Sequence, residues 1–170
     1  MKHLYILRHA KSSWAQPGLG DIQRPLNKRG IKQVANLQAW IDQQGIVPEK
    51  ILCSPATRTQ ETYRGIKAAV EAASFEIVPG LYNGRIDDYL QSLWIQEADR
   101  IMVIGHNPTC DELARYLTMP GSPASEKLMA HHFGTATMAA FSLDIDDWQQ
   151  LGQASGSLEV MLRPKDLESN

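Results

Sequence analysis

Short apolar runs alternate with longer amphipathic segments along the chain. The mainly aliphatic runs at 2–7, 50–53 and 100–104 are each too short for a helix and predict buried strands. Weaker patterns predict further strands at 76–78, 135–143 and 157–162. We expect the last two to pair across the polar loop that separates them.

Helical periodicity appears between these strands. Residues 28–44 predict an amphipathic helix that ends at Gly45, and one face carries Ile31, Val34, Ala35, Ala39 and Ile41. Residues 55–73 predict a long helix with Ser54 as its N-cap and Pro55 in the first turn. Two further helices are expected at 85–98 and 109–117. Breaker residues predict a turn at 120–123 and a loop at 12–27.

Alternating strands and helices define the expected fold class. This order predicts a three-layer α/β/α sandwich whose central sheet is largely parallel, with an antiparallel part formed by the last two strands. The length of 170 residues suits one domain over 1–170, and the sequence contains no internal repeat or interdomain linker.

Composition narrows the class of protein. The net charge of −2 and the isoelectric point near 6.2 argue against broad nucleic-acid binding. The two cysteines, Cys53 and Cys110, are too few for a disulfide framework and suggest reduced thiols. No signal peptide or membrane-spanning stretch is evident, so we expect a cytoplasmic protein that binds no membrane. We also expect a monomer.

The candidate chemistry lies directly after three of the predicted strands. Arg8 and His9 follow the first strand, Arg58 comes shortly after the second, and His106 follows the third. If these strands are parallel neighbours, the four side chains meet at one edge of the sheet, where ligands of α/β proteins bind. Two arginines can neutralise a phosphoryl group, one histidine can attack phosphorus, and the other can donate to a phosphoryl oxygen. Phosphoryl transfer depends mainly on positioning and charge stabilisation, so this set needs no metal or cofactor.

Four ordered motifs then suggest a family. LRHAKSS, RPLNKRG, SPATRTQET and IGHNP begin at residues 7, 24, 54 and 104. Together the chain resembles the histidine phosphatase superfamily, also called phosphoglycerate mutase-like. Its small size and the form Arg-His-Ala are similar to the SixA branch of phosphohistidine phosphatases. The resemblance covers nearly the whole chain.

The resemblance implies a role for each of the four residues. His9 matches the nucleophile that is transiently phosphorylated, and Arg8 and Arg58 match the phosphate-binding arginines. His106 matches the second pocket histidine, which binds the phosphoryl group and assists transfer. The expected substrate is phosphohistidine on a signalling protein, such as a histidine phosphotransfer domain.

The general acid is the point at which the chain departs from larger members of the superfamily. Those members carry an insertion that supplies a glutamate, and the segment between Thr62 and Gly105 has no room for it. Asp21 is the better candidate for the acid, with Asp87 and Asp88 behind it. The absence of that glutamate suits an enzyme that cleaves a P–N bond. A protonated phosphohistidine releases neutral imidazole, whose conjugate acid has a pKa of about 6.5, so the leaving group needs no strong acid.

Several other residues allow two interpretations. Arg24, Lys28 and Arg29 form either a solvated basic face or an extension of the anion site toward an acidic partner. Asn107 either positions a pocket residue or caps the following helix, and capping is the preferred interpretation. His131 and His132 are adjacent and point apart, which disfavours a shared metal ion. Trp14 lies in the loop near His9.

Other functions could also use a pocket that binds phosphate. A cysteine-dependent phosphatase needs Cys-x5-Arg, and Cys53 is one residue too close to Arg58 for that pattern. A metallophosphatase would need clustered carboxylates. The alternatives that stay open are a phosphomonoesterase acting on a small phosphorylated metabolite and a phosphate-binding module without turnover.

Overall fold

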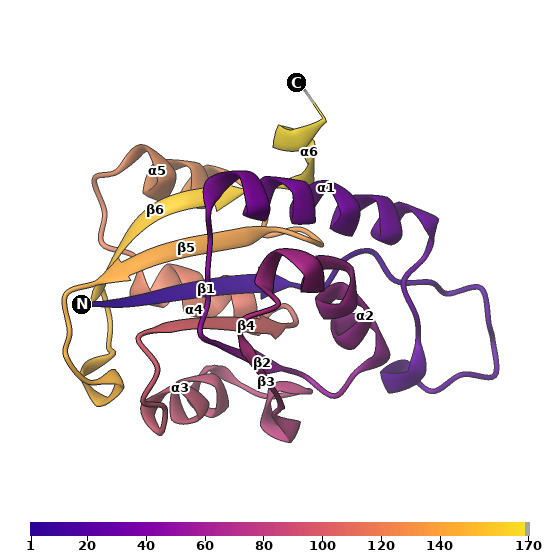
Figure 1. The fold of residues 1–170 in the computed structure, drawn as a ribbon, viewed down its shortest axis with the longest axis horizontal. Helices are drawn as coiled ribbons and strands as arrows, with labels where there is room; N and C mark the ends of the chain where they lie inside the picture. The colour runs from indigo at the N-terminus through magenta and orange to yellow at the C-terminus, as the bar shows by residue number, and fades with distance from the viewer. Residues whose placement is uncertain (169–170) are drawn as a thin grey trace.

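The computed structural model describes residues 1–168 and contains one mixed sheet of six strands (Figure 1). In chain order the strands are β1 (Lys2–Arg8), β2 (Lys50–Cys53), β3 (Ser74–Ile77), β4 (Arg100–Gly105), β5 (Met138–Leu143) and β6 (Gly156–Leu162). Their spatial order is β3-β2-β4-β1-β5-β6. The first four strands are parallel, and β5 and β6 add the predicted antiparallel part.

Helices cover both faces of the sheet. One face packs against α1 (Lys28–Gln44) and α2 (Thr57–Ile66), and the other against α3 (Ile86–Trp94), α4 (Thr109–Leu117) and α5 (Pro123–Ala130) (Figure 1). A short helix, α6 (Pro164–Leu167), contacts α1. In the buried strands alternate residues enter opposite cores, as Ile101 and Met102 of β4 do, whereas the residues of β3 are exposed. The three-layer α/β/α prediction is therefore confirmed.

The strand ends meet as the sequence pattern predicted. The amide of His9 donates to the carbonyl of Gly105 at 3.0 Å, and the amide of Ser54 donates to that of Ile104 at 3.1 Å. These bonds continue the β1–β4 and β2–β4 ladders past the last paired residues. The segments that carry Arg8, Arg58 and His106 are thereby fixed at one edge of the sheet.

Helix boundaries differ from prediction in three places. The helix expected at 55–73 begins at Thr57, ends at Ile66 and continues only as a 3₁₀ turn, so Ser54 is not its N-cap. The helix expected at 85–98 is limited to α3. Helix α5 was missed, because the prolines at 120 and 123 suggested a turn alone. Pro123 instead occupies the first helical position, where its missing N–H carries no penalty, and Ser122 caps it.

The apolar face of α1 was partly misjudged. Val34 and Ile41 are buried as expected, together with Leu37, but Ile31, Ala35 and Ala39 are exposed. The buried stripe includes Gly30 and Gln33, which the hydrophobic pattern could not reveal. Among residues 1–168, no helix is long and apolar enough to cross a bilayer.

Candidate active site

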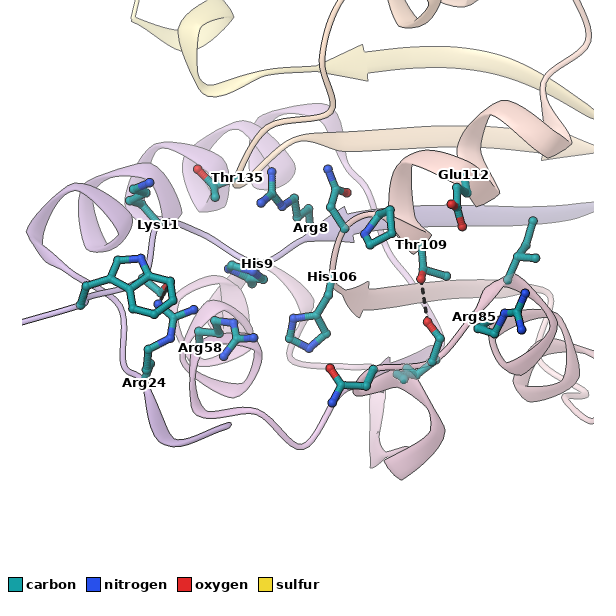
Figure 2. Close-up of a pocket in the computed structure, with 18 residues that line it drawn as sticks. Arg8, His9, Lys11, Arg24, Arg58, Arg85, His106, Thr109, Glu112 and Thr135 are labelled. Atoms are coloured by element: carbon teal, nitrogen blue, oxygen red, sulfur yellow. Dashed lines mark hydrogen bonds between the residues drawn. The ribbon is translucent and has the colours of Figure 1, made fainter. Parts of the chain in front are cut away.

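A cavity of about 650 Å³ opens at the carboxyl edge of the parallel strands (Figure 2). All four predicted residues, Arg8, His9, Arg58 and His106, line it. Figure 2 shows them grouped in its middle, with Lys11 and Arg24 toward one end and Arg85 and Glu112 toward the other. The structure therefore brings together the residues that sequence reasoning selected from three separate segments.

His9 is held as a neutral imidazole with one free lone pair. Its Nδ1 lies 2.7 Å from the carbonyl oxygen of Ala10, which can only accept a hydrogen bond. Nδ1 therefore carries the proton, and Nε2 keeps the lone pair needed for nucleophilic attack. Burial disfavours the charged ring and lowers the pKa of His9 to about 3, despite the opposing effect of the Ala10 hydrogen bond.

His106 faces His9 across the pocket. The two ring centroids are 5.2 Å apart, and Nε2 of His106 lies 2.7 Å from Oγ of Ser54. That hydroxyl also accepts a hydrogen bond from the amide of Ala56 at 3.3 Å, and we assign its own proton to the bond with Nε2. This assignment leaves Nδ1–H of His106 as a donor. Burial, followed by the charge of Arg58, lowers the pKa of His106 to about 4.

Arg8 leaves part of its guanidinium without a partner. Its Nη1 donates to the carbonyl of Phe133 at 3.1 Å, and Nδ2 of Asn107 donates to the same oxygen at 2.7 Å. Asn107 therefore holds the loop that orients Arg8, and the preferred capping interpretation was wrong. The Nε of Arg8 is buried and makes no hydrogen bond.

Arg58 points into the pocket from the first turn of α2 and is 6% exposed. Its Nη1 donates to the backbone carbonyl of Asp21 at 2.8 Å, and its Nη2 to the Oδ2 atom of the same residue at 3.0 Å. Its Nε is also buried without a partner. Two largely buried arginines thus line the pocket together with the two histidines, and their positive charges favour binding of an oxyanion.

Asp21 occupies a different environment from the one an acid needs. Its carboxylate accepts from the Tyr82 hydroxyl at 2.7 Å, from Arg58, and from Nε of Arg24 at 3.1 Å. The Tyr82 hydrogen bond and then the two arginines lower the pKa of Asp21 to about 2. A carboxylate held in this way has no proton to give at neutral pH. The expected acid role therefore does not fit, and Asp21 instead orients Arg58.

Two residues that support the site were missed from the sequence. Ser54 looked like a helix cap and instead bonds His106. The Tyr89 hydroxyl accepts from the amide of His106 at 3.1 Å and donates to the carbonyl of Leu81 at 3.1 Å. A Cβ at Gly105 would collide with that hydroxyl. Gly105 therefore makes room for the Tyr89 side chain.

The remaining candidate residues, which are the cysteines, Asp88 and the adjacent histidines, are not placed to react with a ligand in the pocket. Burial raises the pKa of both Cys53 and Cys110 to about 12, so neither thiol forms a thiolate near neutral pH. Asp88 accepts the amide of Arg85 at the start of α3. His131 and His132 are exposed. Among the described residues, no group of three or more His, Cys, Asp or Glu side chains is placed to hold a metal ion.

The fold and the arrangement of these four residues fit a phosphatase, and comparison with known proteins supports the same class. The profile of the histidine phosphatase superfamily (branch 1) matches residues 4–100. The chain belongs to this superfamily and is a phosphatase of the SixA-like type.

Individual relatives show how far the similarity extends. An uncharacterised chloroplast protein of Arabidopsis thaliana is 33% identical over 96% of this chain and 78% of its own length. Phosphohistidine phosphatase SixA of Escherichia coli K12 is 27% identical over 83% of this chain and 85% of its own. A crystal structure from Agrobacterium tumefaciens, provisionally named phosphohistidine phosphatase SixA, superposes with a TM-score of 0.81 at 26% identity. That match covers 96% of this chain and 98% of the other.

Proposed function

We propose that this protein is a metal-independent phosphohistidine phosphatase that works through a covalent intermediate on His9. The observation that carries the proposal is the state of the pocket. A neutral histidine with a free Nε2 lone pair lies beside two arginines whose Nε–H groups are buried without partners. The similarity to SixA supports the same assignment.

Transfer to the enzyme requires only an exchange of P–N bonds. The substrate imidazole is first protonated on its unphosphorylated ring nitrogen. Nε2 of His9 then attacks phosphorus, a P–N bond forms, and the bond to the substrate nitrogen breaks as neutral imidazole leaves. Arg8, Arg58 and Nδ1–H of His106 stabilise the phosphoryl oxygens in this step.

Hydrolysis then restores the enzyme. The phosphorylated ring of His9 is cationic, because Nδ1 keeps its proton, and the Ala10 carbonyl at 2.7 Å stabilises that charge. Water attacks phosphorus and the bond to Nε2 breaks. Both water protons stay with the phosphate, and His9 leaves as the neutral ring that began the cycle. Neither half of the reaction needs a carboxylic acid.

The preference for P–N over P–O bonds follows from the proton donors of the pocket. An alkoxide is a poor leaving group unless an acid protonates it, and Asp21 is ionised. Among the described pocket-lining residues Glu112 is the only carboxyl group, and Figure 2 places it on α4 at the end away from Arg24. We therefore propose phosphohistidine on a protein, such as a histidine phosphotransfer domain, as the substrate.

The test compares catalytic efficiency on two kinds of substrate. One is a histidine phosphotransfer domain phosphorylated on histidine, and the other is a panel of phosphorylated sugars, amino acids and nucleotides, each assayed with and without EDTA. We expect kcat/KM to be at least about a hundredfold higher for the phosphohistidine protein, unaffected by EDTA. A higher efficiency on one of the metabolites would instead identify a phosphomonoesterase.

A further inference from the structure

One segment beside the pocket has a charge opposite to that of the rest of the protein. Residues 11–32 contain five lysines or arginines and one aspartate, a net charge of +4. The whole chain has a net charge of −2, so the remaining residues sum to −6. We call residues 11–32 the basic flank. Its one acid, Asp21, is already bound to Arg24 and Arg58.

Most cations of the basic flank are unpaired. Lys11, Lys28, Arg29 and Lys32 are exposed, and no described residue forms an ion pair with any of them. No neighbouring acid in the described part of the chain neutralises these exposed cations, so their electrostatic field reaches into the solvent over about 8 Å, the screening length at physiological ionic strength. The flank can therefore attract an anionic surface to the mouth of the pocket.

The basic flank also exposes large apolar side chains. Trp14 is 75% exposed and Ile31 is 63% exposed, while Leu19 and Ile22 are each more than a third exposed. Ile31 and Leu26 border a second cavity of about 430 Å³ between α1 and α2. Glu61 at this cavity accepts the amide of Leu26. Apolar anchors surrounded by charge are typical of protein interfaces, in which a few large side chains supply most of the binding energy.

The basic flank is continuous with the active site and is held in place. Lys11, Trp14 and Arg24 line the catalytic pocket, and the Arg24 guanidinium stacks on the Trp14 ring at 3.5 Å. The start of α1 is fixed against the loop, since the amide of Asn27 donates to the carbonyl of Lys11 at 3.0 Å. A Cβ at Gly30 would collide with that same carbonyl. Figure 1 shows the loop and the start of α1 at the end of the sheet where β1 finishes.

We propose that the basic flank is the docking surface for an acidic protein face that carries the phosphohistidine, with an apolar side chain of the partner in the cavity beside Ile31. This proposal rests on the proposed function and adds a partner chemistry to it. A small phosphorylated molecule would fill the catalytic pocket without reaching Lys28, Arg29 or Ile31. A folded partner with acidic and apolar residues around its histidine would contact all three.

The experiment separates docking from chemistry with three substrates. Two synthetic peptides of equal length carry a central phosphohistidine flanked by either aspartate and leucine or lysine and leucine, and the third substrate is free phosphohistidine. Each is assayed with the wild type and with Lys28→Glu, Arg29→Glu and Ile31→Ser. The matched control is Lys67→Glu, an exposed lysine beyond the far end of α2, about 15 Å along the helix axis from its first turn.

We expect the wild type to prefer the acidic peptide by at least about tenfold in kcat/KM at low salt, with the preference lost at high salt. Lys28→Glu and Arg29→Glu should each remove most of that preference. Ile31→Ser should lower efficiency on both peptides, and Lys67→Glu should change nothing. Free phosphohistidine should be hydrolysed equally by all variants.

Equal efficiency on the two peptides, or equal losses in Arg29→Glu and Lys67→Glu, would overturn the docking proposal. Binding of the wild type to phosphatidylserine vesicles without any preference between the peptides would also overturn it and identify a membrane surface. In each case, turnover of free phosphohistidine would show that the proposed chemistry still stands. Loss of turnover on all three substrates in the wild type would refute the proposed function itself.

Discussion

His9 and His106 are neutral at physiological pH because both rings are buried beside arginines. A neutral His9 is ready for attack without losing a proton first. The sequence could place both histidines at strand ends, but the pKa shifts depend on burial, which only the assembled pocket creates. For the same reason the sequence could suggest Asp21 as an acid and could not reveal its contacts with Tyr82 and Arg58.

The buried histidines predict how stability changes with pH. Their folded-state pKa values, about 3 and about 4, lie below the unfolded value of about 6.5. Between these limits the unfolded chain binds more protons, so the free energy of unfolding falls as pH decreases. Each histidine should cost about 2 kcal/mol on going from pH 7 to pH 5.

Thermal melts of the wild type and His9→Gln between pH 7 and pH 5 test whether the free energy of unfolding falls as pH decreases. The variant should lose less stability than the wild type between pH 7 and pH 5. Asp21 contributes little in this window, because its carboxyl group is ionised above pH 5 both in the folded state, where its pKa is about 2, and in the unfolded chain, where it is about 3.9. Identical pH dependence of the two proteins would show that His9 titrates normally.

Asp21→Asn tests the orienting role of this carboxylate. The substitution keeps the shape of the side chain and removes the charge that pairs with Arg58. We expect inorganic phosphate to inhibit the variant about tenfold more strongly, since the pocket gains one unit of net positive charge. KM should fall, and kcat should fall only slightly through slower phosphate release. A large loss of kcat on phosphohistidine and alkyl phosphates alike, with phosphate inhibition unchanged, would restore the acid role.

Ser54→Ala tests the assignment of the His106 tautomer. Loss of the 2.7 Å contact removes the group that directs the proton to Nδ1. We expect kcat to fall about tenfold to a hundredfold while the free energy of unfolding changes by about 1 kcal/mol. Nitrogen-15 NMR of the imidazole should show a single tautomer in the wild type and a mixture in the variant. A single unchanged tautomer in both would contradict the assignment.

At the level of elements, the sequence predicted strands better than helix ends. Buried strands such as β2 and β4 are continuous apolar runs bounded by polar residues, and these boundaries are visible locally. Helix α2 is shorter than its pattern suggested at both ends. Ala56 is extended, so the helix begins at Thr57, and after Ile66 the chain continues only as a 3₁₀ turn to Val70. Helix α5 was not predicted, because a proline can mark either a turn or the first residue of a helix.

The packing of α1 on α2 predicts a coupled pair of substitutions. A Cβ at Gly65 would collide with Cγ1 of Val34, so Gly65→Ala should destabilise the protein by about 1–3 kcal/mol. Val34→Ala alone should cost about 1–2 kcal/mol through the cavity that it leaves. In the double variant the new methyl group fills part of that cavity. Urea unfolding of all four proteins should give a total loss smaller than the sum, whereas strict additivity would show that the helices move apart instead.

For the whole molecule, the central claim is that the sheet edge assembles a histidine nucleophile and two arginines from three distant segments. The chain order of the motifs made this predictable, because parallel strands bring their carboxyl ends together. The sequence predicted the missing glutamate, but not the direction of each side chain or the ionised state of Asp21. Both depend on contacts with Phe133, Tyr82 and Ser54, which the sequence motifs do not reveal.

The most direct test of this claim is to trap the phosphoenzyme. The protein is mixed with a phosphohistidine protein, quenched in alkali within milliseconds, digested, and analysed by mass spectrometry. We predict an acid-labile, alkali-stable phosphoryl group on His9, absent in His9→Ala and retained in Cys53→Ser and Cys110→Ser. Turnover by the wild type without any label on His9, or full turnover by His9→Ala, would contradict it.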